Sequence, residues 1–333
     1  MLKKFSRSVS IAIGSVTISA LMASNAIAAE YTIKVANVMG PTHDTSMAVD
    51  YFAELVDEKS EGKIKVQHYP GGQLGSDNET FEAAQQGMLD IASGSSANLV
   101  TMTKAFEVLH LPYIFRNLDQ VHQALGSPEV KEHINEELAK VGMHWLFTFD
   151  YGFRDINTID KVIEKPADLK GLKIRASRSP LEIDGIKAFG GSAITVDWPE
   201  VYNALKFKVV DGETQPYGTL VSARHHEILK HTTDVDWQYY AFVGVVSNKQ
   251  WEKYPGWVKE ILLSAASEAE KHHQKIWLEE DKKAEQAFLE AGGEVIEVSD
   301  EDLQEWVELG KSTWSNSGVS QETIDLVVKH SGQ

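Results

Sequence analysis

Two arginines occupy positions where a guanidinium group could hold a carboxylate. Arg175 lies near the end of segment 172–176, in which apolar and charged residues alternate as they do in a strand with one buried face. A guanidinium there can present two parallel N–H donors to one carboxylate, although many arginines form structural salt bridges instead. Arg154 lies at a predicted passage between two lobes, where it either contacts a ligand or ties the lobes together. The chemistry that these two residues favour is the binding of an anion.

Three neighbouring features could complete such a site. Trp198 stands in a predicted loop, where a large aromatic side chain either covers the end of the sheet or stacks on a ligand. Gln215 can both donate and accept hydrogen bonds, which suits a ligand hydroxyl or carboxylate, but a loop glutamine can also be merely solvated. The serine-rich segment 93–96 offers hydroxyl and N–H groups to a polar ligand, or is a simple turn.

The residue types that would support catalysis or metal binding do not occur in a working pattern. His226 and His231 are five residues apart rather than four, so on a helix the second imidazole would be turned about 140° away from the first. The segment 94–96 lacks the second glycine of a nucleophile elbow, and no glycine-rich phosphate loop follows a predicted strand. The chain has no cysteine, which excludes a thiol nucleophile and a thiolate metal site. We therefore expect neither an enzyme nor a bound metal or cofactor.

The elements that must position these residues are strands alternating with helices. One stretch has predicted strands at 31–35, 64–66 and 89–92, and a second has them at 172–176, at 193–196 and from 209–210 onward. Such alternation indicates a parallel sheet, whose ligand crevice lies beyond the carboxyl ends of its strands. This places Arg175, Trp198 and Gln215 at the rim of the second sheet.

The connections predict how the two lobes are joined. Segments 145–149 and 237–247 are apolar enough to be central strands that cross between the lobes, with hinges near 151–153 and 237–240. A helical pattern over 255–291 would be roughly 50 Å long and should span both lobes. Shorter helical stretches are expected at 118–138 and 299–329. The predicted fold is an α/β clamshell in which residues 29–151 and 240–279 form lobe I, and residues 152–239 and 280–333 form lobe II.

The N-terminus has the pattern of an export signal. Three cationic residues precede an uncharged run at 11–23, and the small residues 26–28 suit a signal peptidase, which predicts a signal peptide over 1–28 that is cleaved near Ala28. Its removal takes away three cationic side chains and no acidic one, so the formal net charge moves from −17 to −20. A charge of this sign argues against a general nucleic-acid or anionic-lipid surface, but not against a local cationic pocket.

Seven segments together resemble one known family across the whole mature chain. They are GGQLGSDNE, QQGMLDIA, FEVLHLPYIF, LKGLKIRA, WPEVYNALK, VVDGETQP and VSNKQWEKYP. The chain resembles the solute-binding proteins of tripartite ATP-independent periplasmic (TRAP) transporters, in the C4-dicarboxylate-binding branch. The resemblance implies a two-lobed clamshell with a long helix across both lobes, which binds an organic acid and delivers it to a membrane permease.

The resemblance also assigns site residues. Arg175 matches the principal carboxylate-binding arginine of the family, Arg154 matches a second arginine that often faces the ligand, and Trp198 matches an aromatic position that packs on it. Gln215 falls where the family most often has asparagine. The remaining predicted ligand residues lie at variable positions that line the cleft, namely His43, Ser95 and Tyr239. Some relatives clamp the ligand through a metal with an acidic residue after the VDG triplet, but this chain has Thr214 and Gln215 there.

The resulting prediction is a monomeric periplasmic solute-binding protein for an organic acid, without catalysis. A periplasmic enzyme acting on sugar or hydroxy acids and a ligand sensor for a membrane receptor remain as alternatives. The sequence leaves open which acid is bound: a dicarboxylate, a hydroxy or keto acid, a sugar acid, an aromatic acid or a sulfonate.

Overall fold

The computed structural model describes residues 29–333 and has a mixed α/β architecture, and the predicted signal peptide lies outside the described residues. Nine strands form one sheet in the order β2-β1-β3-β8-β4-β7-β5-β6, and β9 pairs with β8. The strands are β1 (Tyr31–Ala36), β2 (Ile64–Tyr69), β3 (Ile91–Ser95), β4 (Met143–Thr158), β5 (Lys173–Ala176), β6 (Ser192–Thr195), β7 (Gly212–Gln215), β8 (His231–Ser247) and β9 (Glu294–Glu297).

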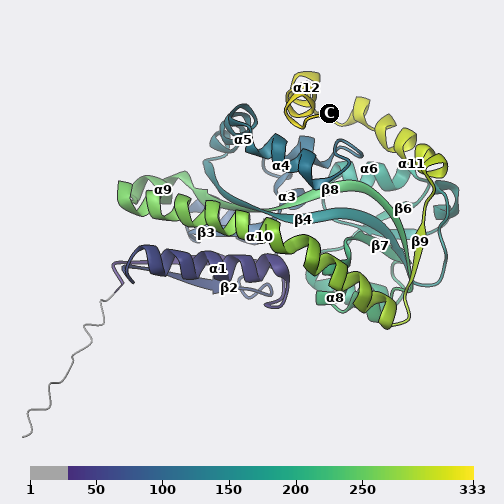
Figure 1. The fold of residues 1–333 in the computed structure, drawn as a ribbon, viewed down its shortest axis with the longest axis horizontal. Helices are drawn as coiled ribbons and strands as arrows, with labels where there is room; N and C mark the ends of the chain where they lie inside the picture. The colour runs from purple at the N-terminus through teal and green to yellow at the C-terminus, as the bar shows by residue number, and fades with distance from the viewer. Residues whose placement is uncertain (1–28) are drawn as a thin grey trace, which may run out of the picture.

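Twelve helices surround this sheet within the described residues (Figure 1). They are α1 (Asp44–Lys59), α2 (Asp77–Gln86), α3 (Ser96–Leu99), α4 (Leu118–Gly126), α5 (Pro128–Lys140), α6 (Pro180–Ala188), α7 (Val201–Lys206), α8 (Tyr217–Ser222), α9 (Asn248–Lys253), α10 (Gly256–Glu290), α11 (Asp300–Ser312) and α12 (Gln321–His330). None of the described helices is long and apolar enough to cross a lipid bilayer.

Two long antiparallel strands, β4 and β8, run through both halves of the sheet. In the first half, β3 pairs with residues 242–246 of β8, and in the second half β7 pairs with residues 155–158 of β4 while β9 pairs with residues 231–234 of β8. The predicted central strands at 145–149 and 237–247 are therefore confirmed and extend further than expected. They continue into the second half because their residues stay apolar or hydrogen-bonded on both faces.

The pairing of β4 with β8 is interrupted where the two halves meet. The register shifts between Asp150 and Gly152 and again between Arg154 and Ile156. Gly152 has a φ of +113°, and a Cβ there would come within 2.6 Å of the Trp277 ring, so only glycine fits this bulge. The irregularity coincides with the segment predicted as a hinge.

The long helix α10 bridges the halves, as predicted. It packs against α1 of the first half and α8 of the second, and it lies across the strand β4 (Figure 1). Its buried face includes Ala265, Ala269, Trp277 and Phe288, which recur at helical spacing. At ~1.5 Å per residue its length agrees with the expected value of roughly 50 Å.

The predicted helical stretch 118–138 is confirmed and forms two helices, because Pro128 lacks an N–H and begins α5 at its first position. Two other predictions of local structure differ from the structure. The stretch 299–329 is also two helices, and α12 packs against α4 and α5, so residues 321–330 cover the first half rather than the lobe II to which they were assigned. Strand β7 begins at Gly212 rather than at 209, because Lys208 adopts a φ of +54° and the N–H of Val209 bonds back to Ala204 to close α7.

Candidate functional site

Arg175 is enclosed between the two halves and keeps part of its guanidinium without a protein partner. Its neighbours on β5, Ile174 and Ala176, point into an apolar cluster, so strand alternation sends Arg175 to the opposite face. The side chain is 3% exposed, and its Nε donates to the Val196 carbonyl at 3.0 Å. Among the described residues it forms no ion pair, although Arg175 lies 5.6 Å from the centre of the Trp198 ring.

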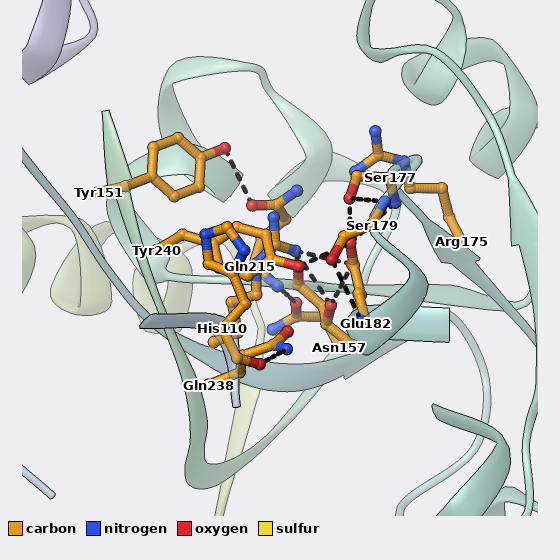
Figure 2. Close-up of polar contacts among 12 residues, drawn as sticks. His110, Tyr151, Asn157, Arg175, Ser177, Ser179, Glu182, Gln215, Gln238 and Tyr240 are labelled. Carbon is orange, nitrogen blue, oxygen red and sulfur yellow. Dashed lines mark hydrogen bonds and ion pairs between the residues drawn. The ribbon is translucent and has the colours of Figure 1, made fainter. Parts of the chain in front are cut away.

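Gln215 lies close to this arginine with one unused donor. It ends strand β7, which is adjacent to β5, and its backbone N–H donates to Asn157 at 2.7 Å. Figure 2 shows its side-chain oxygen accepting from the Tyr151 hydroxyl at 3.0 Å. The side-chain Nε2 is buried without a partner among the described residues. Gln215 is thus the last residue of a strand rather than the solvated loop residue of the alternative interpretation.

Trp198 is half-buried and contacts both halves of the molecule. It packs on the apolar cluster around α1 and α10 and also on the cluster around α7 and α8. Behind it stands His225, whose ring centre lies 5.1 Å away and whose Nδ1 is 2.6 Å from an oxygen of Glu213. Glu213 is fully buried, and its second oxygen has no partner among the described residues.

Two predicted residues come to the site from the first half. Ser95 ends strand β3, is buried, and has a hydroxyl without a partner among the described residues, so segment 93–96 is the end of a strand rather than a turn. His43 is the N-cap of α1, where Nδ1 accepts from the Thr45 N–H. Its Nε2 lies 3.3 Å from the Thr219 hydroxyl of α8, and its ring stacks on Tyr151 at 5.9 Å. His43 therefore links the two halves.

Arg154 is buried and paired with a carboxylate. Its NH1 donates to Glu182 and to the Thr214 hydroxyl, each at 3.0 Å, and its guanidinium carbon lies 4.0 Å from the centre of the Tyr240 ring. Burial alone would lower the pKa of Arg154, but the Glu182 carboxylate raises it. The alternative to ligand contact was a tie between the lobes, but Glu182 and Thr214 both belong to the same half as Arg154.

Glu182 is the centre of this buried network (Figure 2). Besides Arg154, it accepts from the Thr214 hydroxyl at 2.9 Å, the Ser177 N–H at 2.9 Å, the Ser177 hydroxyl and the Tyr240 hydroxyl at 3.1 Å. Burial alone would raise the pKa of Glu182, but Arg154, and after it Arg175, holds it below its usual range. The carboxylate is therefore charged at neutral pH.

Tyr239 points away from these groups. Its hydroxyl donates to Asp150 at 2.9 Å, and its ring packs among the apolar residues under α2, α4 and α5. Adjacent strand residues face opposite sides of the sheet, so Tyr240 is the neighbour that reaches the network of Arg154.

Several residues of the site were missed by sequence reasoning. Glu182 stands three residues after the N-cap Ser179, a spacing that predicts a helix start but not a buried ion pair. Tyr151 lies in the predicted hinge segment, and the pair Glu213–His225 has no motif spacing. Their common signal, visible only in the fold, is burial of a polar side chain at the end of a strand.

Two cavities open near these groups. One of about 460 Å³ is lined among others by His43, Tyr151 and Thr219, and one of about 570 Å³ lies where Arg178 and Asp197 meet α2. Both are lined by residues of the two halves, but Arg175, which is 3% exposed, lines neither.

One acidic cluster could in principle attract a cation. Asp155, Asp234 and Asp236 bring carboxylate oxygens within 4.8 Å of one another. Asp155 already accepts from the N–H groups of Val235 and Asp236, both at 3.0 Å, and burial raises its pKa well above the ordinary value. The cluster is accounted for by the bulge that it caps between β4 and β8.

The arrangement is suited to the binding of an anion. Arg175 and Gln215 keep N–H donors without a partner among residues 29–333. His225 is hydrogen-bonded to Glu213 and to no hydroxyl among these residues.

Comparison with known proteins places the chain in a family. Residues 35–321 match bacterial extracellular solute-binding protein family 7. The C4-dicarboxylate-binding periplasmic protein DctP of Rhodobacter capsulatus is 29% identical over 299 residues, which are 89% of each chain. The 2,3-diketo-L-gulonate-binding periplasmic protein YiaO of Escherichia coli is 28% identical over 255 residues, 77% of each chain.

Solved structures support the same family assignment. A TRAP periplasmic solute-binding protein from Sulfurospirillum deleyianum with bound succinate has a TM-score of 0.85 at 26% identity, covering 91% of this chain and 100% of its own. The sugar acid binding protein of Advenella mimigardefordensis in complex with galactonate has the same TM-score and identity, covering 90% of this chain and 97% of its own. The two halves are thus the lobes of a periplasmic-binding-protein fold, and the chain belongs to bacterial extracellular solute-binding protein family 7.

Proposed function

We propose that this protein captures a small organic acid anion between its lobes in the periplasm and delivers it to the membrane permease subunits of a TRAP transporter. In this proposal it acts as a monomer after cleavage near Ala28. The observation that carries the proposal is Arg175, a buried guanidinium that lacks a protein counter-ion among the described residues and adjoins unused polar atoms. A buried charge of this kind is costly unless a ligand pairs with it.

The proposed contacts follow from the geometry. Arg175 holds the carboxylate, Gln215 donates through its free Nε2, and Trp198 covers the carbon skeleton. Ser95 and His43 approach from lobe I. Arg154 contributes through a guanidinium whose charge Glu182 balances, and Tyr239 contributes through the packing of its strand.

Binding in this proposal is coupled to hinge closure. We place the lobe boundaries at 151/152 and 239/240, close to the register shift of β4 and β8 between Asp150 and Gly152, and α10 is a second link between the lobes. A ligand that contacts both lobes favours the closed state only by its higher affinity for that state.

The test begins with a thermal-shift screen across organic acids, because a ligand that binds only the folded form raises its melting temperature. The ligand found is then measured by calorimetry against Arg175→Ala, which should weaken binding by more than ~2 kcal/mol, or about 30-fold. Arg178→Ala is the control, since it removes the same charge from an exposed arginine that pairs with Asp197. Full affinity in Arg175→Ala would refute the proposed role.

A further inference from the structure

Only one of the two enclosed arginines has a charge left for a ligand. The Arg154 guanidinium is 3.0 Å from Glu182, and both side chains are at least 98% buried. Glu182 also accepts from Thr214, Ser177 and Tyr240, so its charge is held in place by four further hydrogen bonds. Together the two side chains present a neutral unit.

Three carboxylates of the protein also lie near Arg175, namely Glu213, Asp197 and the buried Asp77. Glu213, which is paired in register with Arg175 across the sheet and so shares its face, lies 2.6 Å from His225. Asp197 is held at the mouth of the cleft by two hydrogen bonds from Arg178, at 3.0 and 2.8 Å. A second ligand carboxylate would therefore be buried without a cation to pair with, which is strongly unfavourable.

The polar atoms that have no partner among the described residues suit ligand hydroxyls instead. Gln215 offers a buried donor, Ser95 offers a hydroxyl that donates and accepts, and Glu213 offers a buried acceptor oxygen. An ionised carboxylate carries no hydrogen to donate, so it cannot satisfy the Glu213 oxygen, whereas an alcohol can donate to it and accept from the other two.

We propose that the site selects a singly charged hydroxy acid over a dicarboxylate of the same length. The inference rests on the proposed organic-acid function and names the substrate class of the same site. One anionic group binds at Arg175, and the hydroxyls of the chain meet Gln215, Ser95 and Glu213.

The experiment varies charge and hydroxyl content separately. Calorimetry at about pH 8, where all these acids are ionised, compares butanoate, D-erythronate, succinate and L-tartrate at constant ionic strength. The same comparison with six carbons uses hexanoate, D-gluconate, adipate and galactarate. The hydroxylated monoanion should bind at least about tenfold more tightly than the other three of its length. The inference is overturned if a dicarboxylate binds as tightly as the hydroxylated monoanion of its length or more tightly, or if none of the eight acids binds.

A variant tests the origin of the selectivity. Glu182→Gln removes the anion that balances Arg154, so the ratio of dicarboxylate to hydroxy-acid affinity should rise about tenfold. Asp197→Asn makes the same charge change at the exposed mouth and should leave the ratio within about threefold. An unchanged ratio in folded Glu182→Gln overturns the role of Glu182, and if this variant does not fold, the comparison of the eight acids in the unaltered protein decides.

Failure of the inferred selectivity can be distinguished from failure of the proposed function. A protein that binds a dicarboxylate tightly through Arg175 keeps the proposed function and loses only the inference. A protein whose affinity for every acid is unchanged in Arg175→Ala loses the function itself.

Discussion

Replacement of Glu182 by glutamine should destabilise the protein strongly even without ligand. The change leaves the Arg154 guanidinium, which is 2% exposed, without its counter-ion inside the molecule. Breaking a buried pair by removing one partner costs about 3–5 kcal/mol, a large part of a total unfolding free energy of roughly 5–15 kcal/mol. We therefore expect Glu182→Gln to lower the free energy of unfolding by about 3–5 kcal/mol.

The converse variant, Arg154→Gln, should lower the free energy of unfolding by less. In Arg154→Gln the Glu182 carboxylate keeps the donors of Ser177, Thr214 and Tyr240, so its charge remains hydrogen-bonded. In Glu182→Gln, Arg154 loses its one ion-pair partner among the described residues and keeps the Thr214 oxygens and the rings of Tyr240 and Tyr151. The double variant should cost less than the sum of the two, because neither charge is then unpaired.

Urea denaturation of the four proteins without ligand, at neutral pH, measures this cycle. The pKa of Glu182 is lower in the folded state than its ordinary value. The stability that the charged form contributes is therefore fully present at pH values above the ordinary pKa and is lost as pH falls through the folded-state pKa. The difference in unfolding free energy between Glu182→Gln and the unaltered protein should become smaller in acid. Strictly additive single variants, or a cost for Glu182→Gln below about 1 kcal/mol, would contradict the buried-pair argument.

Two further predictions concern packing and pH. Gly185→Ala in α6 would place a Cβ 2.4 Å from the Trp237 ring and should lower the free energy of unfolding by about 1–3 kcal/mol. The control Gly256→Ala places its Cβ where nothing lies within 4 Å and should be neutral or slightly stabilising. Equal urea midpoints for the two variants would disprove the contact. Burial raises the pKa of Asp77 to about 6 in the folded state. The protonated carboxyl therefore stabilises the folded state, and this contribution is lost as pH rises from about 4 through about 6. In Asp77→Asn the melting temperature should change less with pH over that range. A profile of unchanged slope would show that Asp77 does not titrate in that range.

Sequence periodicity identified the strand that carries Arg175 and the rim on which Trp198 and Gln215 stand. Alternation in β5 was sufficient because Ile174 and Ala176 fix which face is buried. The same reasoning could not separate Tyr239 from Tyr240, since β8 is apolar on both faces and gives no alternation. It also could not pair Arg154 with Glu182, because the two are brought together only in the folded sheet, where β4 pairs with β7 and α6 packs on β5 and β6.

The placement of Glu182 is the reason why we expect one side chain to affect both stability and selectivity. It stands in the first turn of α6, where the Ser179 hydroxyl accepts from its N–H at 3.4 Å and its own carboxylate accepts from the Ser177 N–H. These bonds hold the loop that directly follows Arg175 on β5, so the guanidinium that we propose as the anion site is positioned before any ligand arrives. Because the same carboxylate neutralises Arg154, a substitution at 182 would change the charge of the site and loosen the loop together. Arg154→Gln keeps the loop bonds while removing the neutral pair, so comparison of these two variants separates charge from positioning.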